Sequence, residues 1–197
     1  MNLFDKQKKE CLHGIDQSRK GSFDAPIHEL IVFINSHNDF FTTSSCSGRI
    51  VLFMEGETKK KGCKWLLASH DEIGATHIME KIEERSDEDD KIDLKYEPFI
   101  LHVQCRTLEC AKLMLKIALG CGYRNSGIVI GKKEKFMLAV RSTHGAEAPL
   151  KFNKSVIVSN EYIQHITDNV NSKLGENFER INKFFEALKA GLSGGTK

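Results

Sequence analysis

Apolar residues recur every three or four positions in several segments of this 197-residue chain, which is the pattern of helices with one buried face. The predicted helices cover residues 2–14, 26–38, 72–84, 106–122 and 160–190. The last of these keeps the spacing from Tyr162 to Leu188, so a single long amphipathic helix is expected. Residues 191–197, which are rich in glycine, are expected to form a flexible tail.

Runs of apolar and β-branched residues between turn formers predict strands. These runs cover residues 49–55, 63–70 and 97–105, and two further strands joined by a basic turn within 126–144. The acidic segment 83–93 is expected to be a solvated loop. The mixture of helices and strands predicts an α+β protein.

One arrangement of elements occurs twice in the chain. Each copy has a helix, a polar Ser-Gly turn, a strand, a basic turn, and a strand ending near a histidine, at about residues 26–70 and 106–144. We therefore expect a duplicated α-β-β module that forms a mixed sheet flanked by helices, within a single domain of residues 1–190. A pseudo-twofold arrangement of the copies would bring the two Ser-Gly turns to a shared cleft.

Composition and charge narrow the class of protein. The chain is 40% hydrophobic and 28% charged, as ordinary globular proteins are, and its net charge of +2 does not by itself indicate nucleic-acid binding. No stretch approaches the roughly 18 apolar residues of a membrane helix, and the N-terminus has no apolar signal core, so a cytoplasmic protein is expected. The six cysteines form no CxxC pair, and no metal site is expected.

The polar run before the strand 49–55 is the first candidate site. Small side chains and glycine let a backbone approach a ligand closely, and hydroxyl and N–H groups then act as donors. The candidates in this run are Ser44, Ser45, Cys46, Ser47, Gly48 and Arg49. A serine-rich turn without a ligand is the alternative, because turns are rich in these residues.

The corresponding segment of the second copy, Gly122–Gly127, contains glycines that suggest a dinucleotide fingerprint. The spacing is GxGxxxxG from Gly120 onward, and the segment follows a helix and enters a strand, which is the reverse of the Rossmann order. A Rossmann site is therefore excluded. Arg124 and Asn125, followed by Ser126, still offer groups suited to phosphate or base edges.

Three further clusters carry titratable or basic groups. The strand "LHVQCR" contains His102, Cys105 and Arg106, with His102 and Gln104 expected on one face. The other two clusters are "VRSTHG", with Arg141, Ser142 and His144, whose counterpart is His70, and the loop "DQSRKGSFD", with Asp16, Arg19 and Lys20. Most of these clusters are basic, so one face of the protein is expected to bind a polyanion.

Taken together, these motifs resemble one known family. "DQSRKGSFD", "FFTTSSCSGRI", "WLLASH", "EPFILHVQCR", "GYRNSGI" and "MLAVRSTHG" occur in this order and at distances similar to those of the tRNA wybutosine-synthesizing protein 3 family. The resemblance covers about residues 10–190. It implies an α+β fold that is not the Rossmann fold of most methyltransferases.

The resemblance also implies a reaction. Such a protein would use S-adenosylmethionine to methylate the N-4 nitrogen of a tricyclic guanosine-derived base that bears an aminocarboxypropyl side chain. This base lies just 3′ of the anticodon in tRNA-Phe, and the methylation is one step toward wybutosine.

We expect the two Ser-Gly turns to form the floor of the site. One turn would hold the cofactor and the other the modified base, and the sequence leaves open which does which. The candidates for the cofactor are Ser44, Ser45, Cys46, Ser47, Gly48, Asn125, Ser126 and Gly127. The candidates for the substrate are Lys20, Arg49, His70, Arg106, Arg124, Arg141 and Ser142.

His144 or His102 is the expected general base, because histidine titrates near neutral pH, and Asp16 is the alternative. A rival hypothesis is an RNA-binding module without catalytic activity, in which the same clusters bind phosphates and bases. A weaker one is a hydrolase with Cys46 or Cys105 as nucleophile.

Overall fold

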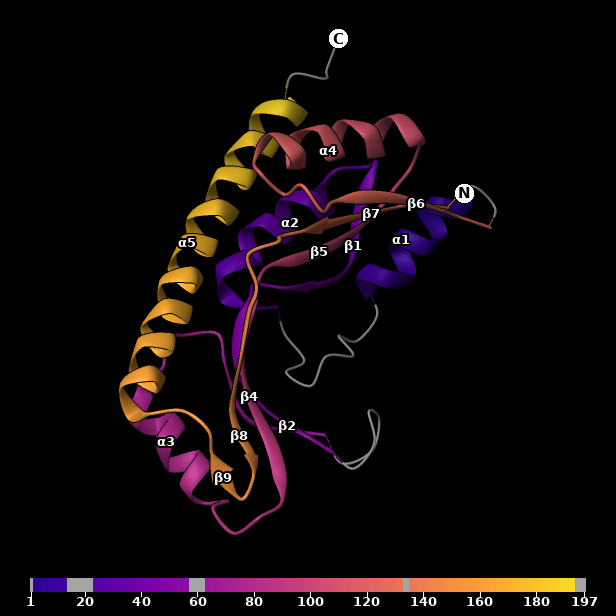
Figure 1. Cartoon of the computed structure of the whole chain (residues 1–197). Coiled ribbons are helices and arrows are strands. Elements are labelled where there is room, and N and C mark those ends of the chain that lie inside the picture. The colour runs from indigo at the N-terminus through magenta and orange to yellow at the C-terminus, as the bar shows by residue number, and fades with distance from the viewer. Residues whose placement is uncertain (1, 14–22, 57–62, 133–134, 194–197) are drawn as a thin grey trace. The chain divides into compact units, whose positions relative to one another are not determined.

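The structure is a computed structural model that describes residues 2–13, 23–56, 63–132 and 135–193 (Figure 1). The backbone forms two compact units, and each contains a sheet of its own. The first unit comprises Met1–Ser47, Phe99–Thr143 and Phe178–Lys197, and the second comprises Gly48–Pro98 and His144–Asn177. The chain therefore passes between the units several times.

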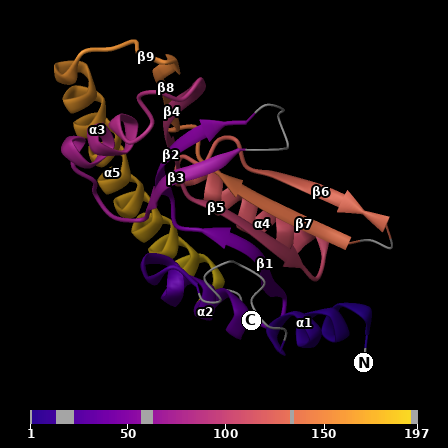
Figure 2. The ribbon, with the colours of Figure 1, turned by 90° about the horizontal axis from the view of Figure 1, so that it is seen from below.

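The first unit contains a four-stranded sheet in the order β1–β5–β7–β6, with every neighbouring pair antiparallel. Its strands are β1 (Phe40–Cys46), β5 (Ile100–Cys105), β7 (Lys135–Arg141) and β6 (Gly127–Gly131). Figure 2 shows these strands side by side, with helix α4 (Leu108–Gly120) behind them. The Thr107 hydroxyl accepts a hydrogen bond from the Cys110 N–H and so caps the first turn of α4.

One face of this sheet carries the core of the unit. Alternate residues of β5 and β7 point to this face. They are buried against residues from three helices: α2 (His28–Ser36), α4, and the last part of the C-terminal helix. The short helix η1 (Ala25–Ile27) precedes α2. The buried set includes Ile31, Ile34, Leu101, Val103, Ala111, Met114, Leu138, Val140 and Phe184. We call the opposite side of the sheet the open face.

Helix α1 (Leu3–His13) covers one end of the open face. The rings of Phe4 and Phe41 pack edge to face with centroids 5.2 Å apart, and Gln104 Nε2 donates to Gln7 Oε1 at 2.6 Å. Phe4 is its one buried side chain among the described residues. Polar contacts therefore contribute much of what holds α1 in place.

The second unit contains a five-stranded antiparallel sheet in the order β3–β2–β4–β8–β9. Its strands are β2 (Arg49–Glu55), β3 (Lys64–Ser69), β4 (Asp90–Glu97), β8 (Ala146–Asn153) and β9 (Ser155–Val156). Helix α3 (Ala75–Glu83) and the first part of α5 contribute Ile78, Ile82, Val170 and Leu174 to its buried residues. The Asn171 side chain donates to the Ile73 carbonyl and accepts from the Ile73 N–H, which ties the start of α3 to α5.

The C-terminal helix α5 extends from Asn160 to Ser193 without a break (Figure 1). Its residues up to Asn177 belong to the second unit, and those from Phe178 onward belong to the first. The expected long amphipathic helix is thus confirmed, and it continues three residues into the segment expected to be a tail. Among the described residues, no helix combines the length and hydrophobicity that crossing a bilayer requires.

The α+β class and the five main helices agree with the sequence pattern. The strands, however, form two antiparallel sheets where one mixed sheet was expected. The hairpin β2–β3 of the first proposed copy lies in the second unit, and the hairpin β6–β7 of the second copy lies in the first unit. A duplication behind these two hairpins stays a prediction.

The expectation of a solvated acidic loop at 83–93 is wrong for its last part. Strand β4 begins at Asp90, and Asp93 is only 2% exposed. Asp90 is held by ion pairs at 2.6 Å to both Arg85 and the fully buried Lys151. Partners distant in the sequence thus bring these carboxylates into the sheet.

Candidate active site

The open face of the first unit brings together side chains from distant parts of the sequence. The register pairs Ser44 of β1 with His102 of β5, His102 with Ala139 of β7, and Ala139 with Gly127 of β6. Residues that pair directly in an antiparallel sheet project to the same side. One row across the sheet therefore joins two of the sequence clusters, the serine run and the Ser-Gly turn before β6.

Ser44 and His102 form the most reactive pair in this row. Ser44 Oγ and His102 Nδ1 lie 2.9 Å apart. Burial lowers the pKa of His102, and the nearby positive charge of Arg141 lowers it further. Both effects favour the neutral ring, which is the form that a proton acceptor must have.

An irregularity in β1 sets the orientation of Ser44. Thr42 pairs with Val103 and Ser44 with the adjacent His102, so Thr43 is an extra residue, a β-bulge. Thr42 points toward the core, and without the bulge Ser44 would do the same, because residues two apart share a face. The bulge turns Ser44 and Cys46 to the open face.

Helix α2 supports this bulge through Asn35. The Asn35 side chain accepts from the Thr42 N–H at 2.8 Å and donates to the Thr42 hydroxyl at 3.1 Å. Sequence reasoning missed both residues. The position of Asn35 directly after the apolar run at residues 30–34 was the available signal.

The two residues that complete the row are the smallest available. Ala139 and Gly127 present almost no side chain on the open face, and a Cβ added to Gly127 would have no atom within 4 Å. The sheet thus leaves open space at Gly127, in the same row as His102 but two strands away. This is the arrangement expected where a ligand lies flat against a backbone.

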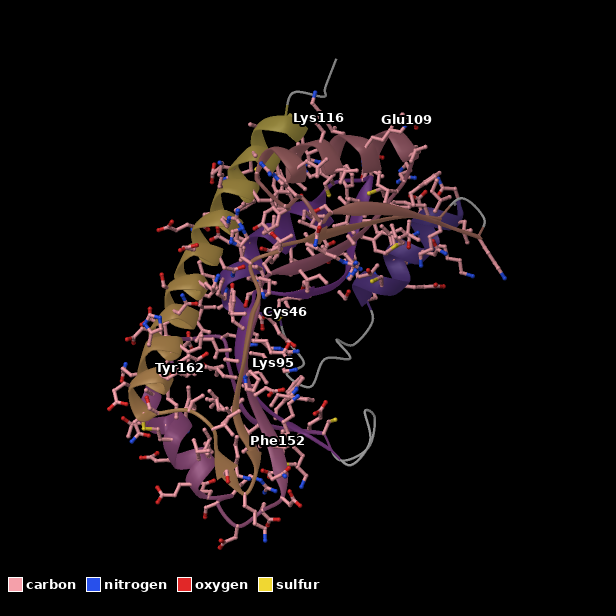
Figure 3. All side chains as sticks on the ribbon, viewed as in Figure 1. Cys46, Lys95, Glu109, Lys116, Phe152 and Tyr162 are labelled. Carbon is pink, nitrogen blue, oxygen red and sulfur yellow. The ribbon has the colours of Figure 1, made fainter. Side chains whose placement is uncertain are left out.

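The neighbouring row of the open face carries a thiol and a guanidinium group. Cys46 pairs with Ile100, and Ile100 with Arg141, so Cys46 (labelled in Figure 3) and Arg141 share the open face with His102. The Arg141 N–H donates to Ser126 Oγ at 3.1 Å, which fixes the turn before β6 next to this row. Arg124 and Asn125 of that turn are exposed.

The end of the serine run is held by a carboxylate. Asp24 Oδ2 accepts from the N–H of Ser47, whose side chain is fully buried, at 2.9 Å. Asp24 directly precedes the short helix η1, but its side chain makes no capping hydrogen bond there. Its contact with Ser47 depends on tertiary structure, and no sequence pattern gave it.

Arg106 occupies a different environment from that expected. Its guanidinium forms ion pairs with Asp5 at 2.7 Å and Asp39 at 2.8 Å, donates to the Asn38 carbonyl, and stacks over the Phe4 ring. These contacts connect α1 to the sheet. A direct role of Arg106 in substrate binding stays a prediction.

The second unit carries three further candidates, His70, Arg49 and His144. His70 Nδ1 lies 2.8 Å from the carbonyl oxygen of Gly48, a residue with a φ of 102° that favours glycine. Arg49 forms an ion pair with Glu97 at 2.6 Å and lies 4.2 Å from the centroid of the Trp65 ring. His144 is half-buried just before β8, whereas Ser142 belongs to the first unit, whose preceding segment ends at Thr143.

Asp16, Arg19 and Lys20 lie outside the described residues. Cys105, in contrast, is well defined. It is 1% exposed, and burial followed by the neighbouring Cys110 raises its pKa to about 12. A thiol that stays protonated is a poor nucleophile, so the structure disfavours a hydrolase based on Cys105.

Comparison with known proteins covers nearly the whole chain. The family described as methyltransferase TYW3 matches residues 6–190. The tRNA wybutosine-synthesizing protein 3 homolog of Pongo abelii is 43% identical over 193 residues, which cover 96% of this chain and 74% of that protein. The Homo sapiens homolog is also 43% identical, with coverage of 96% and 73%.

A solved structure supports the same assignment. The PH1069 protein from Pyrococcus horikoshii has a TM-score of 0.83 and 31% sequence identity, over 93% of this chain and 94% of that one. The resemblance inferred from the sequence motifs is thereby confirmed, as is a fold outside the Rossmann class. The match includes the serine run, His102 and the Ser-Gly turn before β6. The chain belongs to the methyltransferase TYW3 family.

Proposed function

We propose that this protein transfers a methyl group from S-adenosylmethionine to the N-4 nitrogen of the tricyclic base 3′ of the anticodon in tRNA-Phe. The accepting base would carry the aminocarboxypropyl side chain. Membership of the family makes the protein a tRNA methyltransferase of wybutosine biosynthesis. The identity of the tRNA, of the nitrogen and of the methyl donor is the part that we propose. With a tRNA as substrate, we place the reaction in the cytoplasm.

The open face suits the proposed donor. S-adenosylmethionine has carboxylate, amino and hydroxyl groups and a flat adenine ring. Polar partners for the carboxylate, amino and hydroxyl groups are available from the Ser44 and Ser126 hydroxyls and from the turn at Asn125. The strip of the open face at Gly127 and Ala139, which we call the bare strip because it carries almost no side chain, offers space for the adenine ring. When bound, the cofactor supplies a methyl group on a positively charged sulfur atom.

The Ser44–His102 pair is the observation that carries the mechanism. The ring nitrogen of the substrate loses a proton as its bond to carbon forms, and a neutral imidazole can accept that proton. When Nδ1–H donates to Ser44 Oγ, Nε2 keeps its lone pair. In that tautomer Ser44 accepts the hydrogen bond from Nδ1–H, and this contact holds the ring in place.

Among the three candidates for the base we choose His102. Its Nδ1 lies 2.9 Å from Ser44 Oγ on the open face, and its pKa is shifted toward the neutral form. Arg141 lies in the adjacent row and would pair with a carboxylate of the substrate or with a phosphate.

The direct test is single-turnover methylation. Purified protein is mixed with labelled S-adenosylmethionine and with tRNA-Phe from cells that lack this methylation step, and the product nucleoside is identified by mass spectrometry. We expect one methyl group on the N-4 nitrogen. A protein that binds this tRNA but neither binds the cofactor in calorimetry nor transfers methyl groups would be an RNA-binding module, and the proposal would be wrong.

A glycine substitution tests where the donor lies. Gly127→Ala adds a methyl group on the bare strip without a clash in the protein itself. We expect unchanged thermal stability and at least tenfold weaker binding of S-adenosylmethionine. Gly74→Ala, which is equally uncrowded but lies at the start of α3, serves as the control and should leave binding unchanged. Equal binding by all three proteins would remove the donor from this strip.

A further inference from the structure

A second polar site lies on the open face, at the end away from Arg141. A cavity of about 320 Å³ is formed there between helix α1 and the ends of β5, β6 and β7. Three of the side chains that line it are cationic: Arg106, Lys132 and Lys135. The described lining residues include no carboxylate.

The charge of this cavity is only partly neutralised. Asp5 and Asp39 pair with Arg106 from outside the lining. Lys132 and Lys135 flank the β6–β7 connection and are both exposed. The nearby Lys8 donates to the His37 carbonyl, and its pKa is lowered by burial and then by the positive charge of Arg106. The local potential is therefore positive.

Polar groups and an aromatic ring complete the wall. The Gln104 side chain is 3% exposed and donates to Gln7 Oε1, and Phe4 lies beneath the Arg106 guanidinium. Lysine ammonium groups over such a wall are typical contacts for phosphate oxygens. The volume is sufficient for a phosphate with its attached sugar atoms.

The register relates this cavity to the proposed reaction. Along β5, Gln104 lies two residues after His102 on the same side of the sheet, so the cavity begins about 7 Å along the strand from His102. Arg141 lies one row beyond His102 in the other direction. Cationic groups thus flank the reactive pair on both sides.

We propose that the cavity beneath α1 binds a backbone phosphate of the tRNA, with Lys132 and Lys135 as its principal contacts. This inference rests on the proposed function, because it assigns the path of the substrate RNA. A nucleotide whose base reaches His102 has its neighbours along this face. Binding there holds the anticodon loop without reading its sequence.

The test uses matched pairs of lysines. Lys132→Gln/Lys135→Gln removes the two proposed contacts. Lys112→Gln/Lys116→Gln removes the same charge from the exposed side of α4, the helix that packs on the core face (Lys116 is labelled in Figure 3). Binding of a tRNA-Phe transcript is measured at several salt concentrations, and cofactor affinity and thermal stability are measured alongside.

We expect the slope of log affinity against log salt to fall by about 0.7 for the Lys132/Lys135 variant, since the loss of one neutralised phosphate removes about that much. Affinity should drop roughly tenfold at low salt, while cofactor binding and the control variant stay unchanged. Equal slopes for all three proteins, or equal losses in both variants, would overturn the inference alone. No tRNA binding by the unaltered protein would overturn the proposed function as well.

A second measurement needs no substitution. The accessible amines of the unaltered protein are acetylated with and without the tRNA-Phe transcript, and the modified lysines are quantified by mass spectrometry. Protection of Lys132 and Lys135, with continued labelling of Lys112 and Lys116, is the expected result. Unprotected Lys132 and Lys135 in a saturated complex would contradict it.

Discussion

At the scale of the residue, one extra amino acid determines the chemistry of the open face. Thr43 is skipped in the register with β5, although its hydroxyl donates to the His102 carbonyl, and this shift turns Ser44 toward His102 and away from the core. The serine run was recognisable as a candidate site from its composition. Its conformation was not, because a serine-rich segment before a strand is expected to be a turn, and the bulge depends on Asn35 of α2.

Deleting Thr43 should therefore show whether activity depends on the conformation of the serine run or only on the presence of its side chains. The deletion keeps every proposed side chain but restores a regular strand, so Ser44 and Cys46 would point to the core. We expect at least a tenfold loss of methylation rate and a lower melting temperature. Thr43→Ala keeps the bulge and should retain most of the activity, so a deletion variant as active as Thr43→Ala would disprove the role of the bulge.

The histidine in this row gives a prediction with a pH dependence. His102→Ala should lower the single-turnover rate tenfold or more, as is typical of a lost general base. Because the pKa of His102 lies below its ordinary value of about 6.5, the unaltered enzyme should lose activity only in acid below that value. The variant should lack this acid limb.

His165→Ala removes an exposed histidine of α5 and is the control for the histidine series. It should keep both the rate and the acid limb. If His102→Ala also kept them, the base would have to be sought at His144 or Asp16.

At the scale of the element, periodicity predicted the helices well and the strands unevenly. Helix α5 was clear because its apolar spacing persists over many turns. Strand β4 also alternates, with Ile92, Leu94 and Tyr96 buried, but it begins inside an acidic run that indicates a loop. Strand β8 contains Pro149 and the inward-facing Lys151, and neither indicates a sheet residue.

Helix α1 is held in place partly by Arg106, a residue that the sequence predicted to bind the substrate. Arg106 joins this helix to the sheet through Asp5 and Asp39, and these side chains are partly exposed. Each such ion pair contributes only about 0.2–1 kcal/mol, so its loss should act locally.

We expect Arg106→Ala to raise the hydrogen-exchange rate within Leu3–His13 while β5 and β7 keep their protection. Arg106→Lys should restore little, because a single ammonium cannot reproduce the forked contacts. Unchanged exchange in α1 would show that Phe4 and the remaining polar contacts, such as that of Gln7 with Gln104, hold the helix without Arg106.

At the scale of the whole molecule, the two units have different stabilising groups. The first depends on a large apolar cluster, whereas the second also contains Lys151, which is 0% exposed and paired with Asp90. Burial alone would raise the pKa of Asp90, but hydrogen bonds from Lys151 and Arg85 outweigh it and hold that pKa below its usual value. Stability from this pair is thus present above about pH 4 and is lost as the pH falls through the lowered pKa.

Asp90→Asn should lower the free energy of unfolding by about 3–5 kcal/mol at pH 7, because it leaves Lys151 buried without its counter-charge. Hydrogen exchange should increase more in the second unit than in the first, and the difference from the unaltered protein should shrink at pH 3. Asp87→Asn, at an exposed neighbouring position, should have little effect. Equal stability of the two variants would show that Arg85 or solvent compensates for the lost pair.

The order in which the chain contributes to the two units determines how truncated forms of the protein should behave. The first unit is completed only by residues from Phe178 onward, which include the buried Ile181, Phe184 and Leu188. A premature stop codon shortly before Phe178 therefore removes core side chains from the unit that contains the N-terminal part of the chain. A late nonsense mutation should then be as harmful as an early one. Studying either half in isolation calls for rejoining its separate stretches with new linkers, since trimming the termini cannot release it.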